Sequence, residues 1–282
     1  MRKNAIKYSN HKGMMTHLTN NGLSSFGFTF QKGGVHLART MMLEDLESLL
    51  DYVPDVNAER TDYVKAVVDD NCLAKRSVET RKLTERHLTE LYALDPQYTI
   101  FRALRYFWKR DSASRPLLAL LCAYARDSLL RMSAPFILGL HQGDGVQRLE
   151  LEEYIENTYP GRFSKAMLKS LAQNINSTWT KSSHLIGRVN KFRTKTQSAP
   201  GSVSYGLLLG YLRGERGKSL FETEYMKLLD CPLGESIALA EVAALKGWID
   251  FKRLGDVIEV LFPNLLTDEE MELIREQDQK IN

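Results

Sequence analysis

Apolar residues recur at helical spacing along most of the chain. From Ala38 to Val53 they stand three and four residues apart, the pattern of a helix with one buried face. Similar patterns, separated by Pro, Gly and Ser, predict further helices along the chain. They are expected at about 35–53, 58–71, after a Ser77 cap, from Pro96 to 109, and at 117–132, 149–159, 165–177, 183–195, 203–212, 220–230 and 235–246. The pattern therefore predicts a mainly α fold.

The period changes near the C-terminus. In the segment WIDFKRLGDVIEVLF, apolar residues flank KRLG on both sides, which predicts a β-hairpin near 247–262; they are Trp248, Ile249, Phe251, Val257, Ile258 and Val260. A helix followed directly by a hairpin is the layout of a winged helix. Thr267 and Glu270 then form a capping box at the start of a last helix.

The predicted elements suggest three parts. Residues 1–25 are expected to be a disordered basic leader. Residues 26–160 are expected to form an N-terminal helical domain, in which the apolar helix near 117–132 lies at the centre. Residues 161–282 are expected to form a basic C-terminal helical domain with the hairpin.

One stretch has an unusual charge. Between Asn157 and Arg213 there are nine Lys and Arg residues and no Asp or Glu, although the whole chain carries a net charge of only +3. A surface of one sign attracts phosphate groups. The alternatives are a solvated basic face without a partner and a face that docks on the acidic C-terminal part of the same chain.

The acid-free stretch contains a predicted helix-turn-helix. A helix at 165–177, a turn at 178–182 and a second helix from Ser182 or Ser183 to Lys195 would place a cationic stripe beside an apolar one. Hydroxyl groups at the turn are suitable donors to phosphate. The candidate nucleic-acid contacts here are Lys165, Lys169, Thr180, Lys181, Ser182, Ser183, His184, Arg188, Lys191, Arg193 and Lys195.

A second basic cluster precedes and follows the Ser77 cap. It comprises Lys75, Arg76, Lys82 and Arg86, and glutamates are interleaved with it. Phosphate contact and a salt-bridged helix surface are both open interpretations of this cluster.

The sequence contains no recognisable motif for catalysis or for cofactor or metal binding. The six histidines lack metal-ligand spacing, and the chain has no P-loop, dinucleotide fingerprint or nucleophile elbow. We therefore expect a protein without catalytic activity or cofactor. Three cysteines without a CxxC pair fit a reducing cytoplasm. The longest apolar run, 116–125, is too short to span a bilayer, so no membrane association is expected.

Three segments resemble the BrxA family of BREX phage-exclusion systems: NCLAKRSVETRKLTERHLTELYALD, NINSTWTKSSHLIGRVNKFR and ALKGWIDFKRLGDVIEV. The similarity extends over about residues 35–262. It implies a mostly helical protein that is compared in fold with the RNA-binding factor NusB. It also implies double-stranded DNA binding beside a methyltransferase, an ATPase and a phosphatase-like component in bacterial defence.

Three hypotheses about function follow. The first is a non-enzymatic, DNA-binding component of a phage-defence complex that contacts the phosphate backbone. The second is a protein–protein adaptor whose basic zone docks an acidic partner, and the third is a NusB-like RNA-binding factor.

Overall fold

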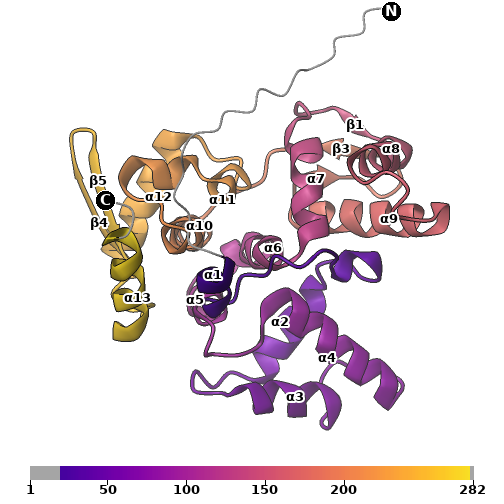
Figure 1. Ribbon diagram of the computed structural model, residues 1–282, viewed down its shortest axis with the longest axis horizontal. Helices are drawn as coiled ribbons and strands as arrows, with labels where there is room; N and C mark the ends of the chain where they lie inside the picture. Colours follow the sequence, from indigo (N-terminus) through magenta and orange to yellow (C-terminus); the bar gives the residue numbers. More distant parts are fainter. Residues whose placement is uncertain (1–19, 280–282) are drawn as a thin grey trace, which may run out of the picture.

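The protein is mainly α-helical, as the hydrophobic pattern predicts (Figure 1). The computed structural model describes residues 20–279, so most of the expected leader lies outside the described residues. The end of the leader, which was expected to be disordered, is helical: Asn20–Ser25 form helix α1, in which Leu23 is buried.

The N-terminal helices pack as a small group below the centre of Figure 1. The expected helix at 35–53 is instead a short 3-10 turn and a helix, because Met42 adopts a left-handed conformation between them. Ser77 caps the following long helix, as expected, by accepting a hydrogen bond from the Thr80 N–H. The group consists of α2 (Leu43–Tyr52), α3 (Arg60–Val68) and α4 (Val78–Tyr92), and the 3-10 turn before it is η1 (Val35–Leu37).

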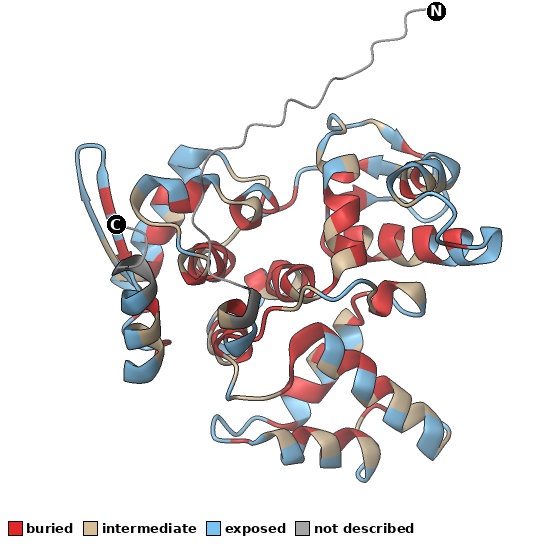
Figure 2. Ribbon diagram, viewed as in Figure 1, coloured by how far each residue is buried: buried red, intermediate tan, exposed pale blue. Residues whose placement is uncertain are grey.

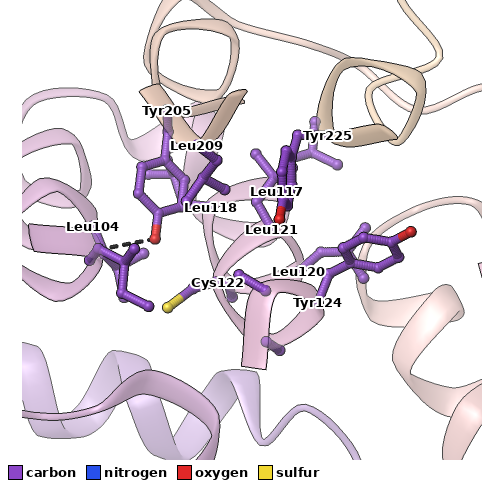
Figure 3. Close-up of a cluster of buried hydrophobic side chains, with 14 of the residues drawn as sticks. Leu104, Leu117, Leu118, Leu120, Leu121, Cys122, Tyr124, Tyr205, Leu209 and Tyr225 are labelled. Carbon is purple, nitrogen blue, oxygen red and sulfur yellow. Dashed lines mark hydrogen bonds between the residues drawn. The ribbon is translucent and has the colours of Figure 1, made fainter. Parts of the chain in front are cut away.

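The centre of the molecule is built around α6 (Arg115–Arg126). Every residue of α6 from Leu117 to Ala125 is buried, which confirms the expected central helix (Figures 2 and 3). In its core the Tyr205 hydroxyl donates to the Ile100 carbonyl at 2.9 Å. Its neighbours include α5 (Thr99–Arg110), η2 (Ser112–Ser114), α7 (Ser128–Leu138) and α10 (Pro200–Leu212).

The helix expected at 117–132 is two helices in the structure. The side chain of Asp127 accepts hydrogen bonds from the N–H groups of Leu129 and Leu130, and so caps α7. An Asp in extended conformation at this position ends α6 and starts the next helix, since its carboxylate satisfies N–H groups that lack partners inside the helix.

A lobe formed by α7, α8, α9 and a three-stranded antiparallel sheet lies at the upper right of Figure 1. We call it the α9 lobe. In its sheet β1 pairs with β3, and β3 pairs with β2, so strands from both sides of the expected domain boundary at 160/161 share one sheet. The lobe's other elements are α8 (Arg148–Thr158), α9 (Lys165–Lys181), β1 (Gly145–Val146), β2 (Leu185–Ile186) and β3 (Lys191–Arg193).

The expected helix-turn-helix is wrong. Its predicted turn is the last part of α9, and the residues expected to form its second helix include the β2–β3 hairpin. Gly187 has a φ of +107°, and a Cβ there would clash with the carbonyl oxygen of Asn190. The hairpin therefore needs glycine at this position, whereas glycine disfavours a helix. The cationic stripe expected along that helix does not form.

The C-terminal part contains the expected hairpin. Strands β4 (Asp250–Leu254) and β5 (Val257–Leu261) pair antiparallel and follow α12 (Leu233–Leu245). The capping box is confirmed, because the N–H groups of Thr267 and Glu270 each donate to the other's side chain. The remaining elements are η3 (Gly217–Glu222), α11 (Glu224–Lys227) and α13 (Asp268–Gln279). Across residues 20–279, no helix has the length and apolar character needed to cross a membrane.

Candidate nucleic-acid interface

Much of the positive charge in the acid-free stretch is neutralised within the chain. Among residues 20–279, four ion pairs join its lysines and arginines to carboxylates: Lys181–Glu44, Arg193–Asp230, Lys195–Glu235 and Arg213–Glu224. Three of these carboxylates belong to residues 224–235, in the acidic C-terminal part. Docking onto that part, one of the alternatives left open by the sequence, therefore accounts for three of the nine cations.

Three of the candidate contacts are buried in a polar network behind the β2–β3 hairpin. Arg193 donates two hydrogen bonds to the Asp230 carboxylate, at 2.6 and 2.8 Å, and one to the Ile137 carbonyl at 3.1 Å. His184 hydrogen-bonds to the Leu228 carbonyl and to Ser182. Since Ser182 and His184 are fully buried and Arg193 is 7% exposed, these side chains hold the fold together and cannot reach DNA in this structure.

The burial of His184 makes the fold sensitive to acid. Burial lowers the pKa of His184 to about 4, against the opposing effect of Asp230. The unfolded chain binds this proton near pH 6.5, so the stabilisation is complete above that pH and is lost as the pH falls towards 4. We expect His184→Gln to reduce the pH dependence of the unfolding free energy between these values, by up to about 1.4 kcal/mol per pH unit.

Urea unfolding at several pH values measures this effect. His141→Gln is the control, because that side chain is 94% exposed. A pH dependence unchanged by His184→Gln would contradict the assignment.

Four cations of the stretch remain exposed, and no carboxylate of the described residues forms an ion pair with them: Arg162, Lys165, Lys169 and Arg188. Lys165 and Lys169 stand one turn apart at the start of α9. Arg162 stacks on the neighbouring ring of Tyr159, with its guanidinium carbon 4.9 Å from the ring centroid. These three residues form a compact basic surface at one end of the α9 lobe.

Arg188 lies on a separate part of the lobe. It occupies the exposed tip of the β2–β3 hairpin, where Val189 is 89% exposed. The adjacent Lys191 ammonium donates to the Thr180 hydroxyl at 2.7 Å, which ties the hairpin to the end of α9. Thr180 is eleven residues beyond Lys169, about 16 Å along the helix. The remaining candidate of the predicted turn, Ser183, is exposed.

The cluster around Ser77 is partly salt-bridged. Lys75 pairs with Asp45 at 2.7 Å, and Arg86 pairs with Glu90 at 3.6 Å. Arg76 and Lys82 are exposed, and no ion pair links them to a carboxylate of residues 20–279. The salt-bridged interpretation therefore holds for Lys75 and Arg86. Phosphate contact by Arg76 and Lys82 stays a prediction.

The sequence interpretation overlooked a basic face on α5. Arg102, Arg105, Lys109 and Arg110 all lie on this helix, and the chain has no acidic residue from 96 to 110. The first three stand at positions i, i+3 and i+7, so they share one side of the helix. A count of acid-free windows shorter than fifty residues would have found this face.

One buried network resembles a catalytic triad. His36 hydrogen-bonds through Nδ1 to the Asp127 carboxylate and through Nε2 to the Thr178 hydroxyl, both at 2.9 Å. However, Thr178 is fully buried, and its oxygen already accepts the Met41 N–H at 2.9 Å. The hydroxyl cannot meet a substrate in this arrangement. The network instead joins η1, the start of α7 and α9.

Among the described residues, no group of three or more His, Cys, Asp or Glu side chains is arranged to hold a metal ion. Comparisons with family models, curated proteins and solved structures found no match to this chain.

Proposed function

We propose that this protein is a non-enzymatic, DNA-binding component of a bacterial phage-defence complex. The observation that carries the proposal is the group of exposed cations without ion-pair partners on the α9 lobe, in a stretch that has no acid of its own. Lys165 and Lys169 at the start of α9 form its centre. Cations on a rigid helix suit the phosphate backbone, which proteins contact without reading sequence. The resemblance to the BrxA family supports the defence setting.

The structure changes the expected mode of binding. Without a second helix there is no recognition helix for the major groove, so we propose contact with phosphates alone. At most four cations, Arg162, Lys165, Lys169 and Arg188, are available on the α9 lobe. In a plot of the logarithm of the binding constant against the logarithm of salt concentration, the slope should then be no steeper than about −3.6. A gel-shift series with random duplex DNA across salt concentrations measures this slope.

Charge reversal at the centre of the surface tests its location. We expect Lys165→Glu with Lys169→Glu to weaken duplex binding at least about tenfold, because two attractive contacts become repulsive. The thermal midpoint should not fall, since neither residue has an ion-pair partner in the described chain and glutamate is favourable at the start of a helix. Lys218→Glu with Lys227→Glu is the matched control, because both lysines are exposed and the net charge changes equally. Equal effects of the two double variants would rule out a localised interface.

A competition experiment distinguishes duplex DNA from single-stranded RNA as the ligand. Duplex DNA should displace a bound labelled duplex more effectively than single-stranded RNA of the same length. The opposite order would favour the third hypothesis, a NusB-like RNA-binding factor. Lack of any duplex binding at low ionic strength would exclude the DNA proposal.

An adaptor role is the second candidate, and exposed apolar residues near the C-terminal hairpin favour it. Leu245 at the end of α12 is 88% exposed, and Leu254 and Val257 next to the β4–β5 turn are 84% and 72% exposed. The α12–hairpin layout resembles a winged helix, but Lys252 of the hairpin pairs with Glu259. This surface suits a protein partner better than DNA. If Leu254→Asp abolished duplex binding, the DNA interface would have to include the hairpin.

A further inference from the structure

The basic face of α5 forms one wall of a cleft. The cleft has a volume of about 680 Å³ and lies between α5, the segment after α2 and the loop before α13. Five cations line it: Arg102, Arg105, Lys109 and Arg110 from α5, and Arg115 from α6. Among the described residues that line the cleft, the one carboxylate is that of Asp51. This volume lies within the range of small-molecule sites.

Two of the five cations are held by carboxylates beside the cleft. Arg102 pairs with Glu270 of α13 at 2.6 Å, and Arg115 pairs with Glu47 of α2 at 2.9 Å. These ion pairs connect the walls to neighbouring helices. The other three cations have no ion pair with any described carboxylate, so an excess of positive charge remains in the cleft.

The three uncompensated cations differ in how they are held. Arg105 is half-buried and donates to the carbonyls of Val53 and Asp55, at 3.3 and 2.5 Å. Arg110 is exposed, and its guanidinium carbon lies 3.5 Å from the centre of the Tyr106 ring. Lys109 is exposed. Together they offer to an anionic group three cations that no carboxylate of the described residues pairs with.

Helix-dipole compensation accounts for part of this charge. Lys109 and Arg110 stand in the last turn of α5, where cations stabilise a helix. That role does not require Arg105 in the middle of the helix, nor the apolar surface that Pro54, Val56 and Leu265 add to the same cleft. The combination indicates a ligand with an anionic part and an apolar part.

Trp108 adds an aromatic side chain to the lining of the cleft. Its ring lines the cleft and is 3% exposed, yet its Nε1–H has no hydrogen-bond partner among the described residues. Buried indole N–H groups usually find a partner, and leaving one unmade costs about 1 to 3 kcal/mol.

We propose that this cleft binds a nucleoside polyphosphate, with its phosphates at Arg105, Lys109 and Arg110 and its base on the apolar wall beside Trp108. A diphosphate carries the several negative charges that three uncompensated cations attract. A planar base provides an apolar face for the wall that Pro54, Val56 and Leu265 form. The site is distinct from the DNA surface, since α5 and α9 lie in different parts of the molecule (Figure 1).

Isothermal titration calorimetry of the full-length protein with ADP tests the proposal at low ionic strength. We expect a dissociation constant of about 10 to 100 μM, with adenosine and inorganic pyrophosphate each binding at least about tenfold more weakly. Pyrophosphate binding as tightly as ADP would reduce the cleft to an anion site and overturn the nucleotide assignment. Absence of a binding signal at about 1 mM ADP would overturn it completely.

Charge reversal then locates the site. Lys109→Glu should weaken ADP binding at least about tenfold. The thermal midpoint should fall only slightly, because this exposed lysine has no ion-pair partner in residues 20–279 and its interaction with the α5 dipole is worth about 0.3 to 1 kcal/mol. Lys218→Glu is the matched control and should leave ADP binding unchanged. The double variant of Lys165 and Lys169 should also bind ADP normally, which separates failure here from failure of the DNA proposal. ADP binding that is insensitive to Lys109→Glu would place the ligand elsewhere.

Discussion

Replacing Asp127 with alanine is expected to lower the free energy of unfolding by about 3 to 5 kcal/mol, which is the usual cost of breaking a buried charged network. The carboxylate accepts four hydrogen bonds. Two come from His36, from its backbone N–H at 3.2 Å and its ring Nδ1 at 2.9 Å. Two come from the N–H groups of Leu129 and Leu130, at 2.8 and 3.1 Å. The substitution therefore removes the cap of α7 and the link to η1 together.

The acid sensitivity of this network has a definite sign. Burial raises the pKa of the Asp127 carboxyl, but the charge and hydrogen bonds of His36 and the backbone N–H groups outweigh it, so the pKa lies below its usual value. A depressed carboxyl pKa stabilises the folded state above the unfolded value of about 3.9. This stabilisation is lost as the pH falls through the lower, folded value. The Asp127 variant should therefore lose less stability than the wild type when acidified below pH 4.

Chemical denaturation of the two proteins measures both effects. Asp256→Ala, in the exposed turn of the C-terminal hairpin, is the control for loss of a carboxylate and should change stability by less than about 0.5 kcal/mol. A loss below about 1 kcal/mol for Asp127→Ala would mean that the network contributes little to the fold.

Replacing Arg193 with alanine is expected to destabilise the protein by about 3 to 5 kcal/mol, because it leaves the Asp230 carboxylate without its partner. Arg193→Lys should also destabilise the protein, by about 2 kcal/mol. A lysine ammonium cannot make the two parallel hydrogen bonds to Asp230 and the third to the Ile137 carbonyl that the guanidinium makes.

The lysine variant distinguishes a structural role from a phosphate contact. If Arg193 were an exposed phosphate contact, Arg193→Lys would retain the positive charge and the protein would lose no stability. We expect the reverse: lower stability, measured by thermal unfolding, and unchanged duplex binding by the protein that remains folded. If Arg193→Lys had normal stability but weakened DNA binding, Arg193 would be a DNA contact after all.

Local signals predicted the helices well where a cap or a continuous apolar face marked them. Ser77, the capping box of Thr267 and Glu270, and the apolar centre of α6 each fix backbone hydrogen bonds or burial within one element. The hairpin at 250–261 was also predicted, because apolar residues on both sides flank a tight turn that contains glycine. These features depend on interactions between residues that are close in sequence, so a local sequence pattern is enough to predict them.

The β2–β3 hairpin was misread for a physical reason. Its strands are only two and three residues long, too short to show alternation, and its apolar residues also fit a helical period. The strand partner of Phe192 is Gly145, far earlier in the chain. Hydrogen bonds to this distant strand support the hairpin, and no pattern within residues 182–195 contains that information.

The sequence by itself determined the mainly α character, the C-terminal hairpin and the presence of an acid-free segment. Only the tertiary structure decided which of that segment's cations remain exposed. Lys181 meets Glu44 across 137 positions, and Arg193 meets Asp230 across 37. An ion pair depends on distance in space, and the fold sets that distance through packing between remote elements. For the same reason the basic cleft at α5 emerged only when α2, α6 and the loop before α13 were placed around it.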